Sequence, residues 1–148
     1  MLWWLYTMTP RKQKNIYGIG VDIVEVSRIT EKLRRSYNLG EEHKFAKKIL
    51  TTSEFVLYLA IEKVSERARF VSKCWAVKEA FVKALGTGFT GDFHWGDIAY
   101  VSPGNVRPTV KLSDRAHYNS LMKNKTIHLS VSDEVATVIA YVTIEEET

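Results

Sequence analysis

The sequence predicts an α+β fold, because segments of alternating apolar residues lie on both sides of a long stretch with helical periodicity. One alternating segment lies at residues 16–24, and helical spacing then extends to residue 85. Four later segments have the pattern of strands: 96–102, 107–112, 126–132 and 137–144. A short helix near residue 113 lies between the second and the third, which gives the order β, β, α, β, β. A chain of 148 residues suits one core. We therefore expect a single domain over residues 16–148, after an N-terminal extension of residues 1–15.

The segment IYGIGVDIV at residues 16–24 has the period of a half-buried strand. Its apolar side chains alternate with Gly18, Gly20 and Asp22. We expect the apolar face to pack in the core and the glycine face to leave open space around the carboxylate of Asp22. A cap for the following helix is an alternative role for Asp22.

Helical signals follow this strand. Apolar residues recur at helical spacing over residues 26–33, and Thr51 and Glu54 have the spacing of a capping box. The second helix should start at this box and continue into the longest one. Over residues 66–85 apolar positions recur at intervals of four and three, and Gly86 supplies a stop. This segment predicts a long central helix.

The composition is that of a globular protein, with 45% hydrophobic and 26% charged residues. Twenty-one Lys and Arg against 17 Asp and Glu give a net charge of +4, which favours an anionic partner such as phosphate, nucleic acid or an acidic protein. The apolar opening MLWWLYTM is far shorter than the ~20 residues that cross a bilayer, so we expect no membrane span.

Glu79 and Lys83 lie about opposite to the apolar stripe of the long helix, on a face shared with Ser72 and Ala76. A solvent-exposed ion pair, worth about 0.2–0.5 kcal/mol, would explain the two charges by itself. The small residues on this face, and the GlyThrGly sequence at 86–88, favour a second interpretation in which space is left for a ligand.

Asp22 and Glu79, with Arg69 and Lys83, together predict a phosphate site. Mg²⁺ often takes only one or two protein carboxylates and completes its shell with water and substrate phosphates. Arg69 and Lys83 would hold the phosphate oxygens.

Four segments are similar to one family, the holo-acyl-carrier-protein synthase type of 4′-phosphopantetheinyl transferase. They are GIGVDIVEVSRI (18–29), FAKKILTTSE (45–54), RFVSKCWAVKEAFVKALGTG (69–88) and HLSVSDE (128–134). The resemblance covers nearly everything after residue 15. It implies that family's fold, an antiparallel sheet packed on a long central helix. The extension departs from the family, as does Asp133, which stands where many members carry a second His.

The resemblance implies transfer of the phosphopantetheine arm of coenzyme A to a serine of an apo acyl carrier protein, as in fatty acid biosynthesis, with release of adenosine 3′,5′-bisphosphate. Asp22 and Glu79 would hold Mg²⁺, with Mn²⁺ as a substitute, on the coenzyme A pyrophosphate. Glu79, or a water that it orients on the metal, would be the base for the serine hydroxyl. The expected substrate-binding residues are Arg69, Lys83, Gly86 and His128.

The resemblance also implies a homotrimer with coenzyme A clefts between neighbouring subunits, and places Arg28 at a carrier-contact position. Arg28, Lys32 and Arg35 form a cationic stripe on one side of the first helix, which would steer an acidic carrier protein. A solvated helix face, whose charge Glu25 and Glu31 partly balance, is the alternative.

A non-catalytic basic module that binds nucleic acid is the competing function. Lys and Arg at 32–35 and 44–48 permit it, but no stacking aromatics are interleaved there and no nucleic-acid motif occurs, so we expect no nucleic acid partner. The single Cys74 suggests a reduced, structural thiol in an intracellular compartment. The extension, a candidate targeting segment, favours the mitochondrion, with the cytoplasm as the alternative.

Overall fold

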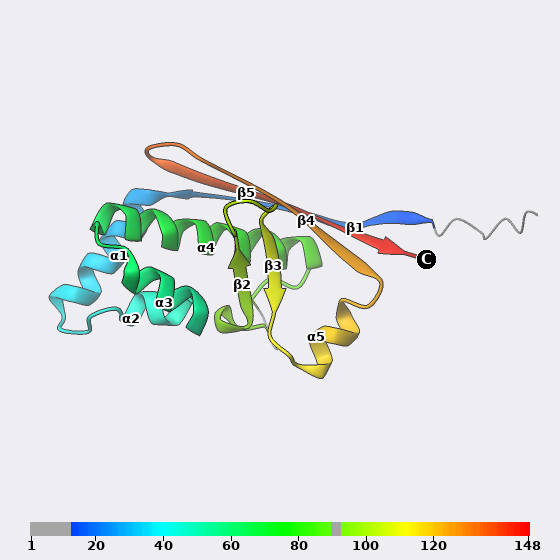
Figure 1. Cartoon of the computed structure of the whole chain (residues 1–148), viewed down its shortest axis with the longest axis horizontal. Coiled ribbons are helices and arrows are strands. Elements are labelled where there is room, and N and C mark those ends of the chain that lie inside the picture. The colour runs from blue at the N-terminus through cyan, green and yellow to red at the C-terminus, as the bar shows by residue number, and fades with distance from the viewer. Residues whose placement is uncertain (1–12, 90–92) are drawn as a thin grey trace, which may run out of the picture.

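The chain is an α+β protein, as predicted (Figure 1). The computed structural model describes residues 13–89 and 93–148. The first half contains β1 (Lys14–Glu25), α1 (Val26–Asn38), α2 (Lys44–Ile49), α3 (Thr52–Ala60) and α4 (Val64–Leu85). The second half contains the 3₁₀ turn η1 (Trp95–Asp97), β2 (Ile98–Val101), β3 (Thr109–Leu112), α5 (Ala116–Leu121), β4 (Lys125–Asp133) and β5 (Thr137–Glu147).

Helix α4 is the centre of the molecule. The strands β1, β5 and β4 form an antiparallel sheet in that order, while β2 and β3 form a separate hairpin. Figure 1 shows the sheet along one side of α4, with α3 on the other side. Twelve of the 22 residues of α4 are buried, so it supplies much of the core. This arrangement confirms the predicted sheet on a long central helix.

Strand β1 packs on the core with its glycine face, whereas the sequence predicted that the apolar face would do so. Gly18 and Gly20 face α4, and a Cβ on either would overlap the carbonyl oxygen of Ala84 or Ala80. The prediction of an open glycine face was therefore wrong, because the helix backbone fills that space. The alternating apolar side chains instead lie 42–62% exposed: Tyr17, Ile19, Val21 and Ile23.

The small residues on the Glu79 face of α4 are also buried rather than open. Ser72 and Ala76 have no exposed surface, and the hydroxyl of Ser72 donates to the carbonyl oxygen of Ala68 at 2.8 Å. The predicted ligand space beside these two residues is therefore absent. They are small because this part of the helix is enclosed.

The capping box is confirmed, but the helix that it starts is short. Thr51 and Glu54 exchange the two expected hydrogen bonds at the start of α3. The chain then leaves the helix after Ala60, so α3 does not continue into α4 as predicted. Arg67 explains the break, because its guanidinium donates to the carbonyl oxygen of Ile61 at 2.6 Å and so satisfies a helix end. Helix α2 was not predicted as a separate element.

Cys74 is fully buried in the core. Burial raises the pKa of its thiol well above the ordinary value, so the thiol stays protonated at neutral pH. This agrees with a structural role.

The predicted extension of residues 1–15 lies mostly outside the described residues, which begin at Gln13. Strand β1 starts at Lys14. Among the helices that the structure describes, none has the length and apolar character needed to cross a membrane.

The contact between β1 and α4 predicts that Gly20→Ala is strongly destabilising. The added methyl group would overlap backbone atoms of α4, and such overpacking costs about 1–3 kcal/mol or more. Gly96→Ala is the matched control, because a Cβ at Gly96 meets no described atom within 4 Å. Urea unfolding would measure both variants. Equal midpoints for Gly20→Ala and Gly96→Ala would contradict this account of the packing.

Candidate active site

An ion pair marks the place where α4 meets β1. The ammonium of Lys83 donates to Oδ1 of Asp22 at 2.7 Å and to the carbonyl oxygen of Val21 at 3.0 Å. The side chain of Asp22 is 15% exposed, while that of Lys83 is 48% exposed. The pair therefore lies at the rim of the helix–sheet contact, with its cation open to solvent.

Glu79 lies one helical turn before Lys83 and faces the same ion pair. Burial raises the pKa of the Glu79 carboxyl, the charge of Asp22 raises it further, and Lys83 opposes both effects. Two carboxylates thus lie near one ammonium group, which pairs with Asp22. The structure brings together three of the predicted site residues, Asp22, Glu79 and Lys83, into a cluster that lacks positive charge.

The donors in this cluster fit a hard divalent cation. Asp22 and Glu79 offer carboxylate oxygens, which Mg²⁺ prefers, and their mutual repulsion would fall when a cation binds between them. Within residues 13–89 and 93–148 no group of three or more metal-binding side chains occurs. A cation at Asp22 and Glu79 would therefore take its remaining ligands from water or from a phosphate substrate.

Arg69 lies far from this cluster. Glu79, the nearer of the two cluster residues on α4, follows Arg69 by ten positions, which corresponds to about 15 Å along the helix. The guanidinium of Arg69 donates to Oδ2 of Asp133 at 3.0 Å and to the carbonyl oxygens of Glu134 and Val135, at the β4–β5 turn. Lys73 also pairs with Asp133, at 2.8 Å, and both cations lower the pKa of that carboxyl, Lys73 more strongly. Sequence reasoning missed these contacts, which attach the turn to α4.

His128 lies on the other face of the sheet from Asp22. It pairs across the strands with Thr143, which in turn pairs with Ile19, and residues paired across strands share a face. Ile19 belongs to the exposed outer face, whereas Asp22 lies on the face toward α4. Nε2 of His128 is 2.8 Å from Oε2 of Glu145. One chain therefore cannot bring His128 to the ion pair.

The outer face of the sheet carries an apolar patch. Strand pairing places Val21 beside Tyr141 and Ile23 beside Ile139, and Ile19 lies on the same face. These five side chains are 42–62% exposed. A contiguous apolar surface of this kind is typical of a protein–protein contact.

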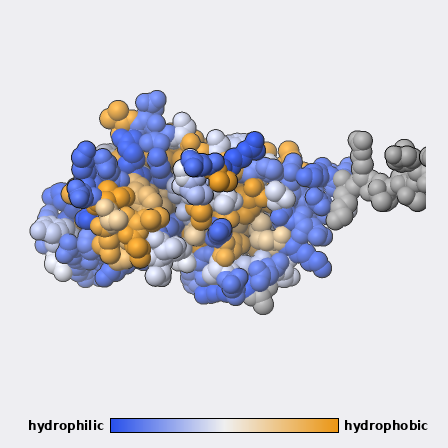
Figure 2. Space-filling model, in the orientation of Figure 1, coloured by the Kyte–Doolittle hydropathy of each residue, from blue (hydrophilic) through white to orange (hydrophobic). Residues whose placement is uncertain are grey.

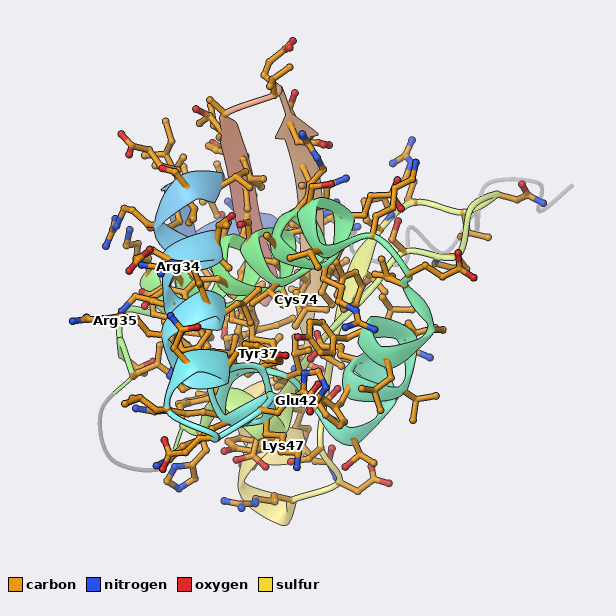
Figure 3. The ribbon with its side chains drawn as sticks, turned by 90° about the vertical axis from the view of Figure 1, so that its left-hand side faces the viewer. Arg34, Arg35, Tyr37, Glu42, Lys47 and Cys74 are labelled. Carbon is orange, nitrogen blue, oxygen red and sulfur yellow. The ribbon has the colours of Figure 1, made fainter. Side chains whose placement is uncertain are left out.

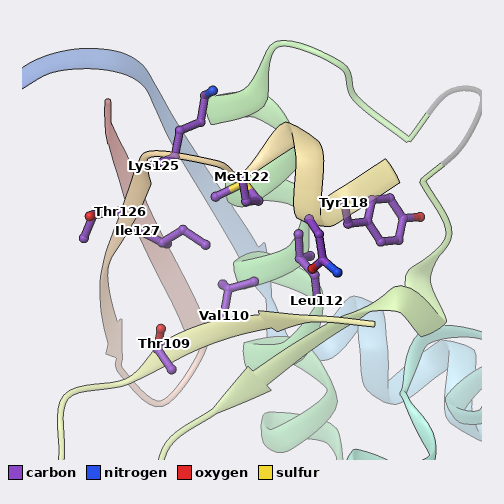
Figure 4. Close-up of a pocket in the computed structure, with 9 residues that line it drawn as sticks. Thr109, Val110, Leu112, Tyr118, Met122, Lys125, Thr126 and Ile127 are labelled. Carbon is purple, nitrogen blue, oxygen red and sulfur yellow. The ribbon is translucent and has the colours of Figure 1, made fainter. Parts of the chain in front are cut away.

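Two hollows on the surface of the described residues lie away from the ion-pair site. One hollow of about 420 Å³ lies between β3, α5 and β4, with Val110, Met122 and Ile127 on its wall (Figure 4). Another of about 330 Å³ lies between α1, α3 and the start of α4. Apolar side chains also gather over α3 and over the β2–β3 hairpin (Figure 2). Neither hollow is lined by Asp22, Glu79 or Lys83.

The cationic stripe on α1 is exposed. Arg28, Lys32 and Arg35 all lie at the surface, and Figure 3 shows Arg35 extending away from α1. Glu31 is engaged by Arg34 through two hydrogen bonds of 2.8 and 3.0 Å. In the described part of the chain no carboxylate lies within salt-bridge distance of the stripe. Glu31 therefore balances Arg34 more directly than it balances the stripe.

Gly86 ends α4 in the left-handed conformation, with φ of 76°. Its N–H group donates to the carbonyl oxygen of Lys83 at 3.0 Å, as in a glycine helix cap. This conformation accounts for the glycine. Its predicted contact with substrate remains a prediction.

Comparisons with known proteins agree with the motifs. The sequence model of the 4′-phosphopantetheinyl transferase superfamily (ACPS) matches residues 18–139. A holo-[acyl-carrier-protein] synthase from Aliivibrio fischeri is 39% identical over 84% of this chain and 96% of its own length. A synthase of the same name from Wolbachia pipientis is 41% identical over 87% of this chain and 97% of its own.

Solved structures show the same fold. A holo-(acyl-carrier-protein) synthase from Bacillus anthracis, in complex with CoA (3′,5′-ADP), superposes with a TM-score of 0.71 at 29% identity, over 88% of this chain and 97% of that one. The acyl carrier protein synthase of Plasmodium yoelii with ADP bound gives a TM-score of 0.75 at 29% identity, over 92% and 99% of the two chains. The chain belongs to the ACPS family of the 4′-phosphopantetheinyl transferase superfamily.

Proposed function

We infer that the protein is a holo-[acyl-carrier-protein] synthase, which transfers the phosphopantetheine arm of coenzyme A to a serine of an apo acyl carrier protein. The cluster of Asp22, Glu79 and Lys83 carries this conclusion. It lies where the segments GIGVDIVEVSRI (18–29) and RFVSKCWAVKEAFVKALGTG (69–88) meet in space. Relatives with this name match nearly their whole length, and a neighbouring structure was solved with CoA.

The reaction breaks one P–O bond of the coenzyme A pyrophosphate. The serine oxygen of the carrier attacks the phosphorus that bears the pantetheine arm, and adenosine 3′,5′-bisphosphate leaves with the bridging oxygen. Lys83 would exchange its contact with the Val21 carbonyl for a phosphate oxygen and so offset the charge of the leaving group. Its exposed ammonium is free to make this exchange.

Glu79 would take the proton from the serine hydroxyl, directly or through a water. Asp22 and Glu79 would hold Mg²⁺ or Mn²⁺, which when bound supplies charge neutralisation at the pyrophosphate.

A homotrimer would complete the site. Within one chain His128 and Arg69 lie away from the Asp22 cluster, while the outer sheet face exposes an apolar patch. The family resemblance implies coenzyme A clefts between neighbouring subunits, which would bring the outer face of one subunit beside the cluster of the next. The number three comes from the family resemblance, and the apolar face supports assembly in general.

The proposed function predicts metal-dependent transfer. Incubation with coenzyme A, Mg²⁺ and an apo acyl carrier protein should add the mass of phosphopantetheine to the carrier, as mass spectrometry would detect. EDTA should abolish the transfer and Mg²⁺ or Mn²⁺ should restore it. Asp22→Asn and Glu79→Gln should each lower kcat/KM by roughly 100-fold or more. Full turnover without metal would contradict the metal assignment, and no transfer to any carrier would contradict the function.

Thermal unfolding of Glu79→Gln in metal-free buffer provides the control for folding. The raised pKa means that ionised Glu79 lowers the stability of the native state above its ordinary pKa of 4.5. At neutral pH the variant should melt at or above the temperature of the wild type. The difference should disappear below pH 4.5, where the carboxyl is protonated in both states. A lower melting temperature at neutral pH would show that lost activity reflects lost structure.

The stripe on α1 predicts a selective effect of Arg28→Glu. Reversing one charge at a carrier contact changes the interaction by about 1–2 kcal/mol, so the KM for carrier protein should rise roughly 5- to 30-fold. The salt dependence of kcat/KM should weaken, and the KM for coenzyme A should stay unchanged. Arg34→Glu is the matched control, because Arg34 pairs with Glu31 instead. Equal effects of the two variants would mean that the stripe is only solvated surface.

The proposed trimer predicts three times the monomer mass in light scattering. Tyr141→Glu, in the outer apolar patch, should dissociate the assembly and remove most activity, since a charge cannot be buried there without a partner. Val106→Glu is the control, because Val106 is exposed in the loop between β2 and β3. A fully active monomer would contradict the proposal.

A further inference from the structure

A buried lysine lies next to Glu79 in the sequence. The side chain of Lys78 has no exposed surface, and its ammonium donates to three oxygens. These are Oε2 of Glu54 at 2.7 Å, the carbonyl oxygen of Ile49 at 2.6 Å and that of Trp95 at 3.1 Å. All three N–H groups of the ammonium are therefore used.

Glu54, whose side chain is 1% exposed, completes a hydrogen-bonded network. Its Oε2 also accepts from the backbone N–H of Thr51 at 2.7 Å, and its Oε1 accepts from that of Tyr100 at 2.8 Å. The pair therefore connects α4 to the end of α2, the start of α3, the turn η1 and strand β2. Three separate elements bind the side chain of Lys78 directly, and β2 is attached through Glu54.

Stability alone does not explain a buried ion pair. Removing two charges from water costs several kcal/mol, and apolar side chains of similar volume often stabilise a core as well or better. Three acceptor oxygens around the ammonium fix its position, because each hydrogen bond needs a short distance and a suitable angle that apolar contacts do not require. The network therefore opposes rotation and sliding of α4 in a way that an apolar pair would not.

Helix α4 is also fixed on the side opposite Lys78, by its close contact with β1. The carbonyl oxygen of Ala80 lies against Gly20 of β1, so residues 78 and 80 are held on two different sides of α4. Glu79 leaves the helix between these two attachments, one turn before Lys83, whose ammonium binds Asp22. The carboxylate of Glu79 lies about 6 Å from the helix axis, so a rotation of roughly 10° would move it by about 1 Å.

We propose that Lys78 and Glu54 are positioning residues that fix the rotation of α4 and thereby hold Glu79 opposite Asp22. This inference rests on the proposed function, because it assigns the network a role in the transfer reaction. A misplacement of about 1 Å in a reactive group can lower a rate by about 100-fold. Groups that orient metal ligands typically change affinity or activity by about 10- to 100-fold when they are removed.

The test compares Glu54→Asp with the double variant Glu54→Gln/Lys78→Met. The aspartate keeps the charge but is one methylene shorter, so it cannot reach both Lys78 and Tyr100. The double variant leaves no unpaired buried charge, which protects its stability. We expect kcat per folded molecule to fall at least 10-fold in both, with the KM for carrier protein unchanged. Mn²⁺ binding, measured by electron paramagnetic resonance, should weaken about 10-fold.

Tyr118→Phe is the control for a general loss of stability. It removes a buried hydrogen bond of 2.9 Å to Asp97, which lies in η1 but also accepts from Ser113 and makes none of the hydrogen bonds described for Lys78 and Glu54. The variant should leave kcat per folded molecule and Mn²⁺ affinity unchanged. Wild-type kcat and Mn²⁺ affinity in a folded double variant would overturn the proposal. If the double variant does not fold, the same result in Glu54→Asp overturns it. Failure of the wild type to transfer phosphopantetheine would refute the proposed function, and Mn²⁺ affinity would then decide the positioning role by itself.

Discussion

The direct contact between the backbones of α4 and β1 is the constraint on which the rest of the structure depends. Gly18 and Gly20 allow it, because any side chain on either would overlap carbonyl oxygens of the helix. The short separation lets Lys83 reach both Asp22 and the carbonyl oxygen of Val21. It also places Glu79 near enough to Asp22 for each charge to affect the other. Fold and site are thus consequences of one packing contact.

The charges of the molecule divide into a buried network and an open cluster. Lys78 and Glu54 are fully satisfied inside the core, where every N–H group and both carboxylate oxygens have partners. Within the described residues, Asp22 pairs with Lys83, and Glu79 lies near enough for both charges to affect its pKa. The first arrangement is rigid, whereas the second has unused capacity for cations and phosphate. This contrast suits a site whose substrate carries a pyrophosphate.

The sequence predicted the positions of the helices and strands better than it predicted which of their faces are buried. Periodicity and capping signals identified α4, the start of α3 and the closing strands, because these signals are local. The faces of β1 were assigned wrongly, since alternation is the same whichever side is covered. A strand whose apolar face packs against another chain has the same alternation of apolar residues as a strand whose apolar face packs in its own core. The prediction of ligand space beside Ser72 and Ala76 was wrong for a related reason, because small residues occur at close packing contacts as readily as beside a ligand.

The candidate site was predictable only in part. Motif spacing brought out Asp22, Glu79 and Lys83, which the structure places together. The partners of Arg69 and the burial of Lys78 depend on residues many positions away, so no local pattern revealed them. His128 lies on the opposite face of the sheet from Asp22, a relation that follows from strand register rather than spacing.

A crystal structure with coenzyme A and Mg²⁺ would test the central claim most directly. The account predicts that the pyrophosphate lies beside Lys83, with the metal ion between the carboxylates of Asp22 and Glu79 and the outer sheet face of a neighbouring subunit close to the nucleotide. A pyrophosphate bound elsewhere, or a metal ion that contacts neither carboxylate, would contradict it.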